Sequence, residues 1–135
     1  MQNHKKESNH EHVSNHEKIN YIELPAKDLG IAKDFFSRLF NWQFTDYGEE
    51  YTAFANAGLN GGFFRAELSS VASQGSALIV LYSDDLDSTL AKIEAETNAA
   101  ISQPIFHFPG GRRFHFIDPN GNEFAVWSDV GIEVV

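Results

Sequence analysis

Residues 19–40 read INYIELPAKDLGIAKDFFSRLF, and this stretch predicts a strand followed by a helix. Side chains alternate between the two faces of a strand, so Ile22 and Leu24 share one face. Tyr21 and Glu23 share the opposite face. The strand therefore presents one apolar face, suited to a core, and one polar face.

A helix is predicted directly after this strand. Asp28 stands where a helix N-cap belongs, because its short side chain accepts a hydrogen bond from the first turn. The apolar residues that follow are spaced by three and four positions and form one face of an amphipathic helix: Ala32, Phe35, Phe36, Leu39 and Phe40. Three short extended segments come next, at residues 42–45, 51–56 and 62–66, with glycines between them.

The same order of elements restarts at residue 77. An apolar strand at residues 77–82 precedes Asp84-Asp85-Leu86, which stands 57 positions after Lys27-Asp28-Leu29. A second helix stripe follows, made of Leu86, Leu90, Ile93 and Thr97. Extended segments are then predicted at residues 103–108, 113–117 and 123–128, and the last two are joined by a type I turn, Asp118-Pro119-Asn120-Gly121.

The two halves, residues 19–70 and 76–130, make up a single α+β domain over residues 19–135. Each half is a βαβββ module, and a module this small buries little core alone. We therefore expect the two modules side by side, with their sheets forming a curved half-barrel around a cavity and their helices outside.

Composition narrows the function classes. Of the 135 residues, 19 are acidic and 10 are Lys or Arg, which gives a formal net charge of −9. Such a chain is poorly suited to binding nucleic acid or an anionic membrane. It has no cysteine, which excludes disulfides, Cys-ligated metal centres and thiol catalysis. No stretch is apolar enough for a signal peptide or a transmembrane helix, so we expect a cytoplasmic protein.

Residues 1–18 are polar and show no period, which predicts a disordered tail. Four of the six histidines of the chain lie here: His4, His10, His12 and His16. Imidazoles at this spacing suit loose binding of a transition metal. The simpler interpretation is a solvated tail with incidental histidines.

Several segments carry a more specific pattern: residues 22–29 (IELPAKDL), residues 35–42 (FFSRLFNW), Gly61-Gly62, Asp84-Asp85-Leu86, Gly110-Gly111-Arg112, and Asp118-Pro119-Asn120-Gly121-Asn122 followed by Phe124 and Trp127. Together they resemble the vicinal-oxygen-chelate superfamily of glyoxalase I, bleomycin-resistance proteins, fosfomycin-resistance enzymes and extradiol dioxygenases. The resemblance covers roughly residues 19–129 and is strongest to a bacterial glyoxalase-like branch. It implies the half-barrel fold and a homodimer.

The resemblance also identifies where a metal would be bound. Metal-using members take one ligand from the first strand and one from the last strand of each module. The first-strand positions fall on Tyr21 and Leu78, and the last-strand positions fall on Ala125 and near Gly61-Gly62. Leu and Ala cannot bind a divalent cation, and Tyr rarely does so at neutral pH. We therefore expect no metal and no other cofactor, in contrast to glyoxalase I.

Glu23 and His115 are the candidate catalytic residues. The resemblance places Glu23 on the cavity face beside Tyr21, as a general base, a ligand acceptor or the partner of Arg112 or Arg113. The register of the last hairpin decides whether His115 or its two Phe neighbours face the cavity. If His115 faces it, the two residues form an acid/base pair or a partial metal site, and a structural histidine is the alternative.

Ligand contacts are predicted at the mouth and walls of the cavity. Arg112 and Arg113 follow a Pro-Gly-Gly loop and suit a carboxylate or phosphate, with a surface ion pair as the alternative. The full set of predicted contacts is Tyr21, Phe54, Arg112, Phe114, Phe116 and Trp127.

Two classes of function stay open. In the first, the chain is an enzyme in which Glu23, with His115, moves a proton in a lyase or isomerase reaction on a small carbonyl compound. In the second, an aromatic cavity sequesters a drug or metabolite without turnover, as bleomycin-resistance proteins do. The residues at Leu78 and Ala125 favour sequestration or a metal-free mechanism. In both cases the expected partner is a small organic molecule.

Overall fold

The computed structural model describes residues 15–131 of the chain. The first module comprises β1 (Tyr21–Ala26), α2 (Leu29–Phe40), β2 (Gln43–Asp46), β3 (Tyr51–Ala55) and β4 (Asn60–Arg65). After the short helix η1 (Ala72–Gln74), the second module comprises β5 (Ile79–Tyr82), α3 (Leu86–Glu94), β6 (Ala100–Phe108), β7 (Gly111–Ile117) and β8 (Glu123–Ser128). His4, His10 and His12 of the predicted tail lie outside the described residues, and so does its proposed metal site.

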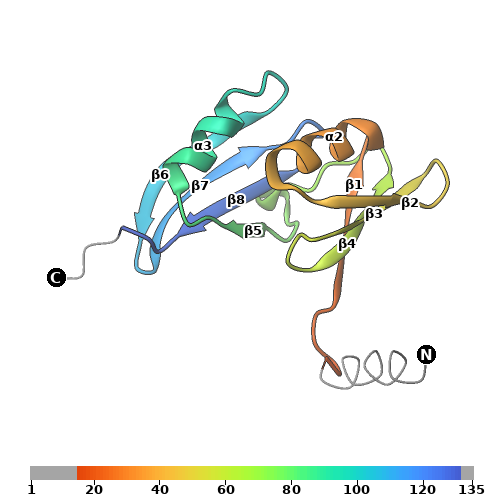
Figure 1. Ribbon diagram of the computed structural model, residues 1–135, viewed down its shortest axis with the longest axis horizontal. Helices are drawn as coiled ribbons and strands as arrows, with labels where there is room; N and C mark the ends of the chain where they lie inside the picture. Colours follow the sequence, from red (N-terminus) through yellow and green to blue (C-terminus); the bar gives the residue numbers. More distant parts are fainter. Residues whose placement is uncertain (1–14, 132–135) are drawn as a thin grey trace.

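Each module folds into a four-stranded sheet with its helix on one side (Figure 1). The strand orders are β1-β4-β3-β2 and β5-β8-β7-β6, and in each sheet the first strand runs parallel to its neighbour while the others are antiparallel. Both helices lie on the same side of the molecule, and the described strands do not close into a barrel. The predicted α+β fold of two βαβββ modules is confirmed. We refer to the sheet surface turned away from the helices as the open face.

Both helices begin where the capping residues predict. Asp28 and Asp85 each accept a hydrogen bond from the backbone N–H three residues later, at 3.0 and 3.2 Å. The second helix is shorter than predicted, because it ends at Glu94 and leaves Thr97 outside it and exposed. Thr97 and Asn98 are weak helix formers, which accounts for this early end. No helix within residues 15–131 has the length and apolarity needed to cross a membrane.

One core serves both modules, because α2 packs against both sheets. Phe35 and Phe36 are almost completely buried. The Phe36 ring lies 5.6 Å from that of Phe63 on β4 and 5.2 Å from that of Phe124 on β8. Phe35 lies 6.0 Å from Phe116 on β7. Burial of these rings therefore stabilises the pairing of the modules as well as each module.

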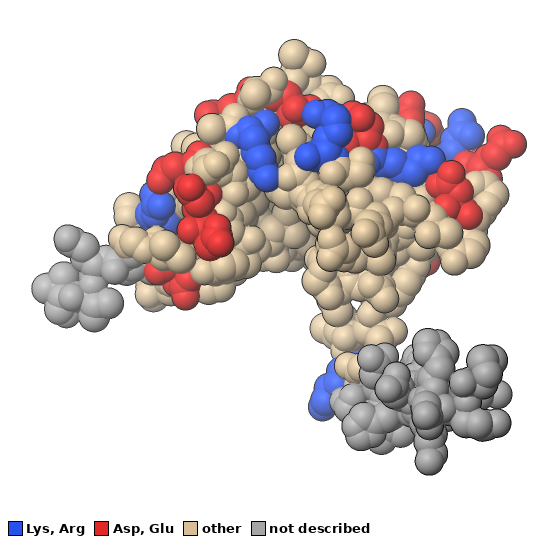
Figure 2. Space-filling view, viewed as in Figure 1, with Lys and Arg blue, Asp and Glu red and all other residues tan. Residues whose placement is uncertain are grey.

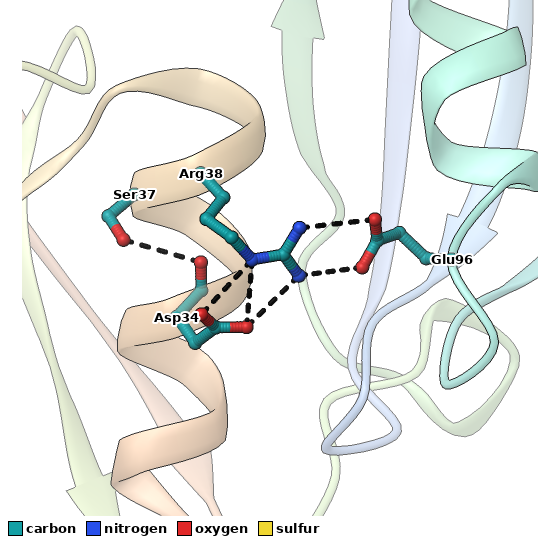
Figure 3. A network of polar contacts seen from close by, with 4 residues as sticks. All are labelled: Asp34, Ser37, Arg38 and Glu96. Carbon is teal, nitrogen blue, oxygen red and sulfur yellow. Dashed lines mark hydrogen bonds and ion pairs between the residues drawn. The ribbon is translucent and has the colours of Figure 1, made fainter.

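A surface ion-pair network provides a second link between the modules. Arg38 of α2 donates from both terminal nitrogens to the carboxylate of Glu96, at 2.7 and 3.2 Å, and its Nε donates to Asp34 at 3.0 Å (Figure 3). The hydrogen bonds from Arg38 hold the pKa of Glu96 below its ordinary value. The two-pronged geometry orients the link, although its exposure to water limits its strength.

Two asparagines of the turn between β7 and β8 fasten the modules together. Asn122 donates to the carbonyl of Pro25 at 2.7 Å and accepts from the N–H of Ser70 at 2.7 Å. Asn120 exchanges two hydrogen bonds with the backbone of Asp28, at 2.9 and 3.1 Å. Both asparagine side chains are buried. We refer to Asn120 and Asn122 as the asparagine clamp, since they tie the second module to the corner between β1 and α2.

Candidate functional site

Two tyrosines and a carboxylate form a hydrogen-bonded chain on the open face of the first module. The hydroxyl oxygens of Tyr21 and Tyr51 lie 2.6 Å apart, and Tyr51 donates to Oε2 of Glu23 at 2.9 Å. Tyr21 and Glu23 thus share one face of β1, as strand alternation predicts. Glu23 makes no ion pair with Arg112 or Arg113 in the described part of the chain.

Tyr51 is a site residue that the sequence analysis missed. Gly62 makes room for it, because a Cβ at that position would overlap the Tyr51 hydroxyl. Burial raises the pKa of Tyr51, and its hydrogen bonds with Tyr21 and Glu23 raise it further. The phenol therefore stays protonated at neutral pH and acts as the donor that orients the Glu23 carboxylate. A glycine in a strand was the available signal, since it often marks the close approach of another group.

A second polar pair lies on the open face of the second module. Nδ1 of His115 is 2.9 Å from Oε2 of Glu123, and both side chains are about nine-tenths buried or more. The other carboxylate oxygen accepts the N–H of Ala72 at 3.1 Å. The hydrogen bond from His115 lowers the pKa of Glu123, so the carboxylate is ionised and Nδ1 carries the proton. His115 and Glu123 line an open pocket of about 560 Å³ beside residues 71–73.

The structure shows which side chains of β7 point toward the helices and which lie on the open face. Phe114 and Phe116 have no exposed surface and belong to the core on the helix side, so His115 takes the open face. Glu23 and His115 belong to different clusters, each with its own partner. Their roles as acid and base stay predictions.

The positions where the resemblance places metal ligands do not fit a divalent cation. The hydroxyl of Tyr21 is hydrogen-bonded to that of Tyr51. The side chains of Leu78 and Ala125 have no atom that can bind a metal ion. Ala125 is fully buried and stands opposite His115 in the ladder between β7 and β8. Within residues 15–131, no three His, Asp or Glu side chains gather in a group able to hold an ion.

An apolar groove of about 510 Å³ lies between the two modules. Phe40, Trp42 and Phe54 form an aromatic wall, Ile22 of β1 and Leu81 of β5 add aliphatic surface, and the loop at residues 56–59 completes the lining. In Figure 2 the charged side chains follow the helix side and the outer edges, while the hollow between the modules is uncharged. The groove therefore suits an apolar molecule.

The predicted ligand contacts Arg112 and Trp127 do not line this groove. Arg112 is on the helix side, where it pairs with Asp87 of α3 at 3.4 Å. Trp127 lies on the open face of the second module, with its ring 5.2 Å from Tyr82 and 6.3 Å from Phe108. Of the six predicted ligand contacts, Phe54 lines the groove.

Comparisons with known proteins agree with this architecture. Residues 18–126 match the model of the Glyoxalase/Bleomycin resistance protein/Dioxygenase superfamily. The structure is similar to FosX, a fosfomycin resistance protein from Listeria monocytogenes, with a TM-score of 0.66, 21% identity, and coverage of 82% of this chain and 91% of that chain. It is also similar to a lactoylglutathione lyase from Agrobacterium tumefaciens, with a TM-score of 0.63, 21% identity, and coverage of 83% and 93%. A glyoxalase-related enzyme from Fulvimarina pelagi gives a TM-score of 0.67 at 15% identity, with coverage of 83% and 88%. No curated protein sequence gives a significant match.

The chain thus belongs to the glyoxalase/bleomycin resistance/dioxygenase superfamily. At these levels of identity the structural neighbours establish the shared fold, and function must be argued from the residues of this chain.

Proposed function

We propose that this protein binds a small, largely apolar organic molecule in the groove between its modules. The groove itself carries the proposal, because its volume of about 510 Å³ falls in the range of small-molecule sites. Phe40, Trp42 and Phe54 offer ring faces to a planar ligand. The amide oxygen of Asn56 and the phenol oxygen of Tyr82 are the polar groups that would orient it as acceptors, since Asn56 Nδ2 donates to Asn41 and the Tyr82 hydroxyl donates to Asp129.

A variant that fills the groove tests this proposal. Ala57→Phe places a ring into the groove, so it should weaken binding of the uncharged dye Nile red by about tenfold or more, the scale of losing a well-packed apolar contact. Dye fluorescence measures the affinity. Ala55→Phe is the matched control, because Ala55 is exposed on β3 and does not line the groove. Equal affinity in the two variants, or no saturable binding by the wild type, would contradict the proposal.

Proton transfer by Glu23 is the second candidate function, as in a lyase or isomerase acting on a small carbonyl compound. It is favoured by the chain from Tyr21 through Tyr51 to Glu23, which orients an exposed carboxylate with one oxygen bonded and the other available. Sequestration without turnover is the alternative.

A homodimer is inferred from the resemblance, and a mass measurement in solution tests it.

The substitution Glu23→Gln separates the two candidates. Because Glu23 is exposed, the melting temperature should stay close to that of the wild type. If Glu23 is a base, the wild type accelerates exchange of the α-protons of hydroxyacetone into D2O, as followed by proton NMR, and the variant does not. Glu49→Gln is the control, since Glu49 is also exposed. A wild type that gives no acceleration over buffer favours sequestration.

A further inference from the structure

Three buried side-chain atoms in the described part of the chain have no hydrogen-bond partner: Arg113 Nε, His115 Nε2 and Asp118 Oδ2. Buried polar atoms are normally paired, so each of the three needs an explanation. For Asp118, burial raises the pKa to about 6, so this oxygen can carry a proton. The other two atoms belong to neighbouring residues on the open face of β7.

Arg113 differs from the other three arginines of the chain. Arg38, Arg65 and Arg112 each form an ion pair with a carboxylate. The side chain of Arg113 forms no hydrogen bond or ion pair with the described residues. Its guanidinium lies over the rings of Phe106 and Phe108, 5.3 and 5.8 Å from their centroids. An arginine held in place by aromatic rings, without a counter-ion in an acidic chain, is available to bind an anion.

His115 offers the complementary group. Its Nδ1–H is held by Glu123, which fixes the orientation of the ring, and its Nε2 has no partner among the described residues. His115 lies against the same aromatic side chain as Arg113, because the Phe106 ring is 5.9 Å from the imidazole. On the open face of β7, the cationic guanidinium of Arg113 and the unpartnered Nε2 of His115 thus belong to residues one strand repeat apart, about 7 Å along the backbone.

We propose that this face of β7 is a binding site for a short-chain hydroxycarboxylate. The carboxylate receives two hydrogen bonds from the guanidinium of Arg113, and a hydroxyl a few atoms along the chain donates to Nε2 of His115. The spacing of the two side chains suits an acid whose hydroxyl is on the second or third carbon. The site is separate from the groove between the modules and does not rest on the function proposed above.

Titration calorimetry with three related probes tests the proposal on the wild-type protein. We use 3-hydroxybutyrate, which has both groups, butyrate, which lacks the hydroxyl, and 1,3-butanediol, which lacks the carboxylate. The hydroxy acid should bind about tenfold more tightly than either of the others, since each loses a hydrogen bond to a charged or buried partner. The imidazole nitrogen signals of His115 should shift on binding.

Two glutamine variants supply the matched control. Arg113→Gln should lose affinity for 3-hydroxybutyrate by about tenfold or more, because its charge is the anchor. Arg112→Gln removes the adjacent charge on the opposite face of β7 and should leave that affinity unchanged, as should Ala57→Phe in the groove.

The proposal is overturned if the two arginine variants bind equally well, if the diol binds as tightly as the acid, or if none of the probes binds. If Arg113→Gln lowers the melting temperature and the wild type shows no preference among the probes, Arg113 is a structural brace on its aromatic neighbours. If that variant does not fold, the comparison of probes on the wild type still decides the question.

Discussion

Replacing Phe36 with Ala is expected to lower the free energy of unfolding by about 3–5 kcal/mol, the cost of removing a buried aromatic side chain from a core. Phe36 has no exposed surface and contacts rings from both sheets. The substitution would therefore leave a cavity in the core where the two modules meet. Chemical denaturation followed by circular dichroism measures the change.

Ile31→Ala is the control for this experiment. Ile31 lies on the same helix, but 39% of its surface is exposed, so its loss should have a much smaller effect. Comparable losses in the two variants would mean that α2 does not hold the modules together through Phe36. A biphasic unfolding curve for Phe36→Ala would show that the modules then unfold separately.

The substitution Asp118→Asn is expected to stabilise the protein at pH 7.5 and to lose this advantage by about pH 4. Burial raises the pKa of Asp118 from 3.8 to about 6, against the opposing effect of the N–H groups of Asn120 and Asn122. Between those values the folded chain binds more protons at this site than the unfolded chain, so stability falls as the pH rises through the window. The full effect approaches about 3 kcal/mol.

Melting temperatures of both proteins across this pH range test the prediction. Asparagine keeps the oxygen that accepts the two backbone N–H groups and replaces the other oxygen by an uncharged group. All other carboxylates are shared by the two proteins, so they cancel in the difference. A difference in melting temperature that does not change with pH would show that folding does not shift the pKa of Asp118.

Local signals in the sequence were enough to predict most of the fold. Asp28 and Asp85 cap their helices because capping depends on a few neighbouring residues. The strand β8 occupies the predicted residues, Glu123–Ser128, since the turn before it is defined by its own residues. The predicted end of α3 was wrong by several residues. Apolar residues at helical spacing can continue past the last turn of a helix, so the spacing alone does not show where the helix ends.

The candidate site was less predictable, because its contacts join distant parts of the chain. Strand alternation placed Glu23 on the correct face, but its partner Tyr51 is 28 residues away and reaches it only through the pairing of three strands. The same holds for Glu123, which meets His115 across a hairpin. Phe114 and Phe116 were assigned to the cavity as an alternative to His115, and only the register of β7 placed them in the core.

The asparagine clamp has a consequence for synthesis of the protein. The backbone groups of Asp28 and Pro25 that it binds find their partners 92 and 97 residues later in the chain. During translation, the polar backbone groups at the corner between β1 and α2 can therefore form hydrogen bonds only with water until these asparagines are available. A nascent chain that stops before residue 120 cannot form the hydrogen bonds of the asparagine clamp. At any stage of folding at which Asn120 and Asn122 are not yet in place, this corner therefore lacks the partners that it has in the folded protein.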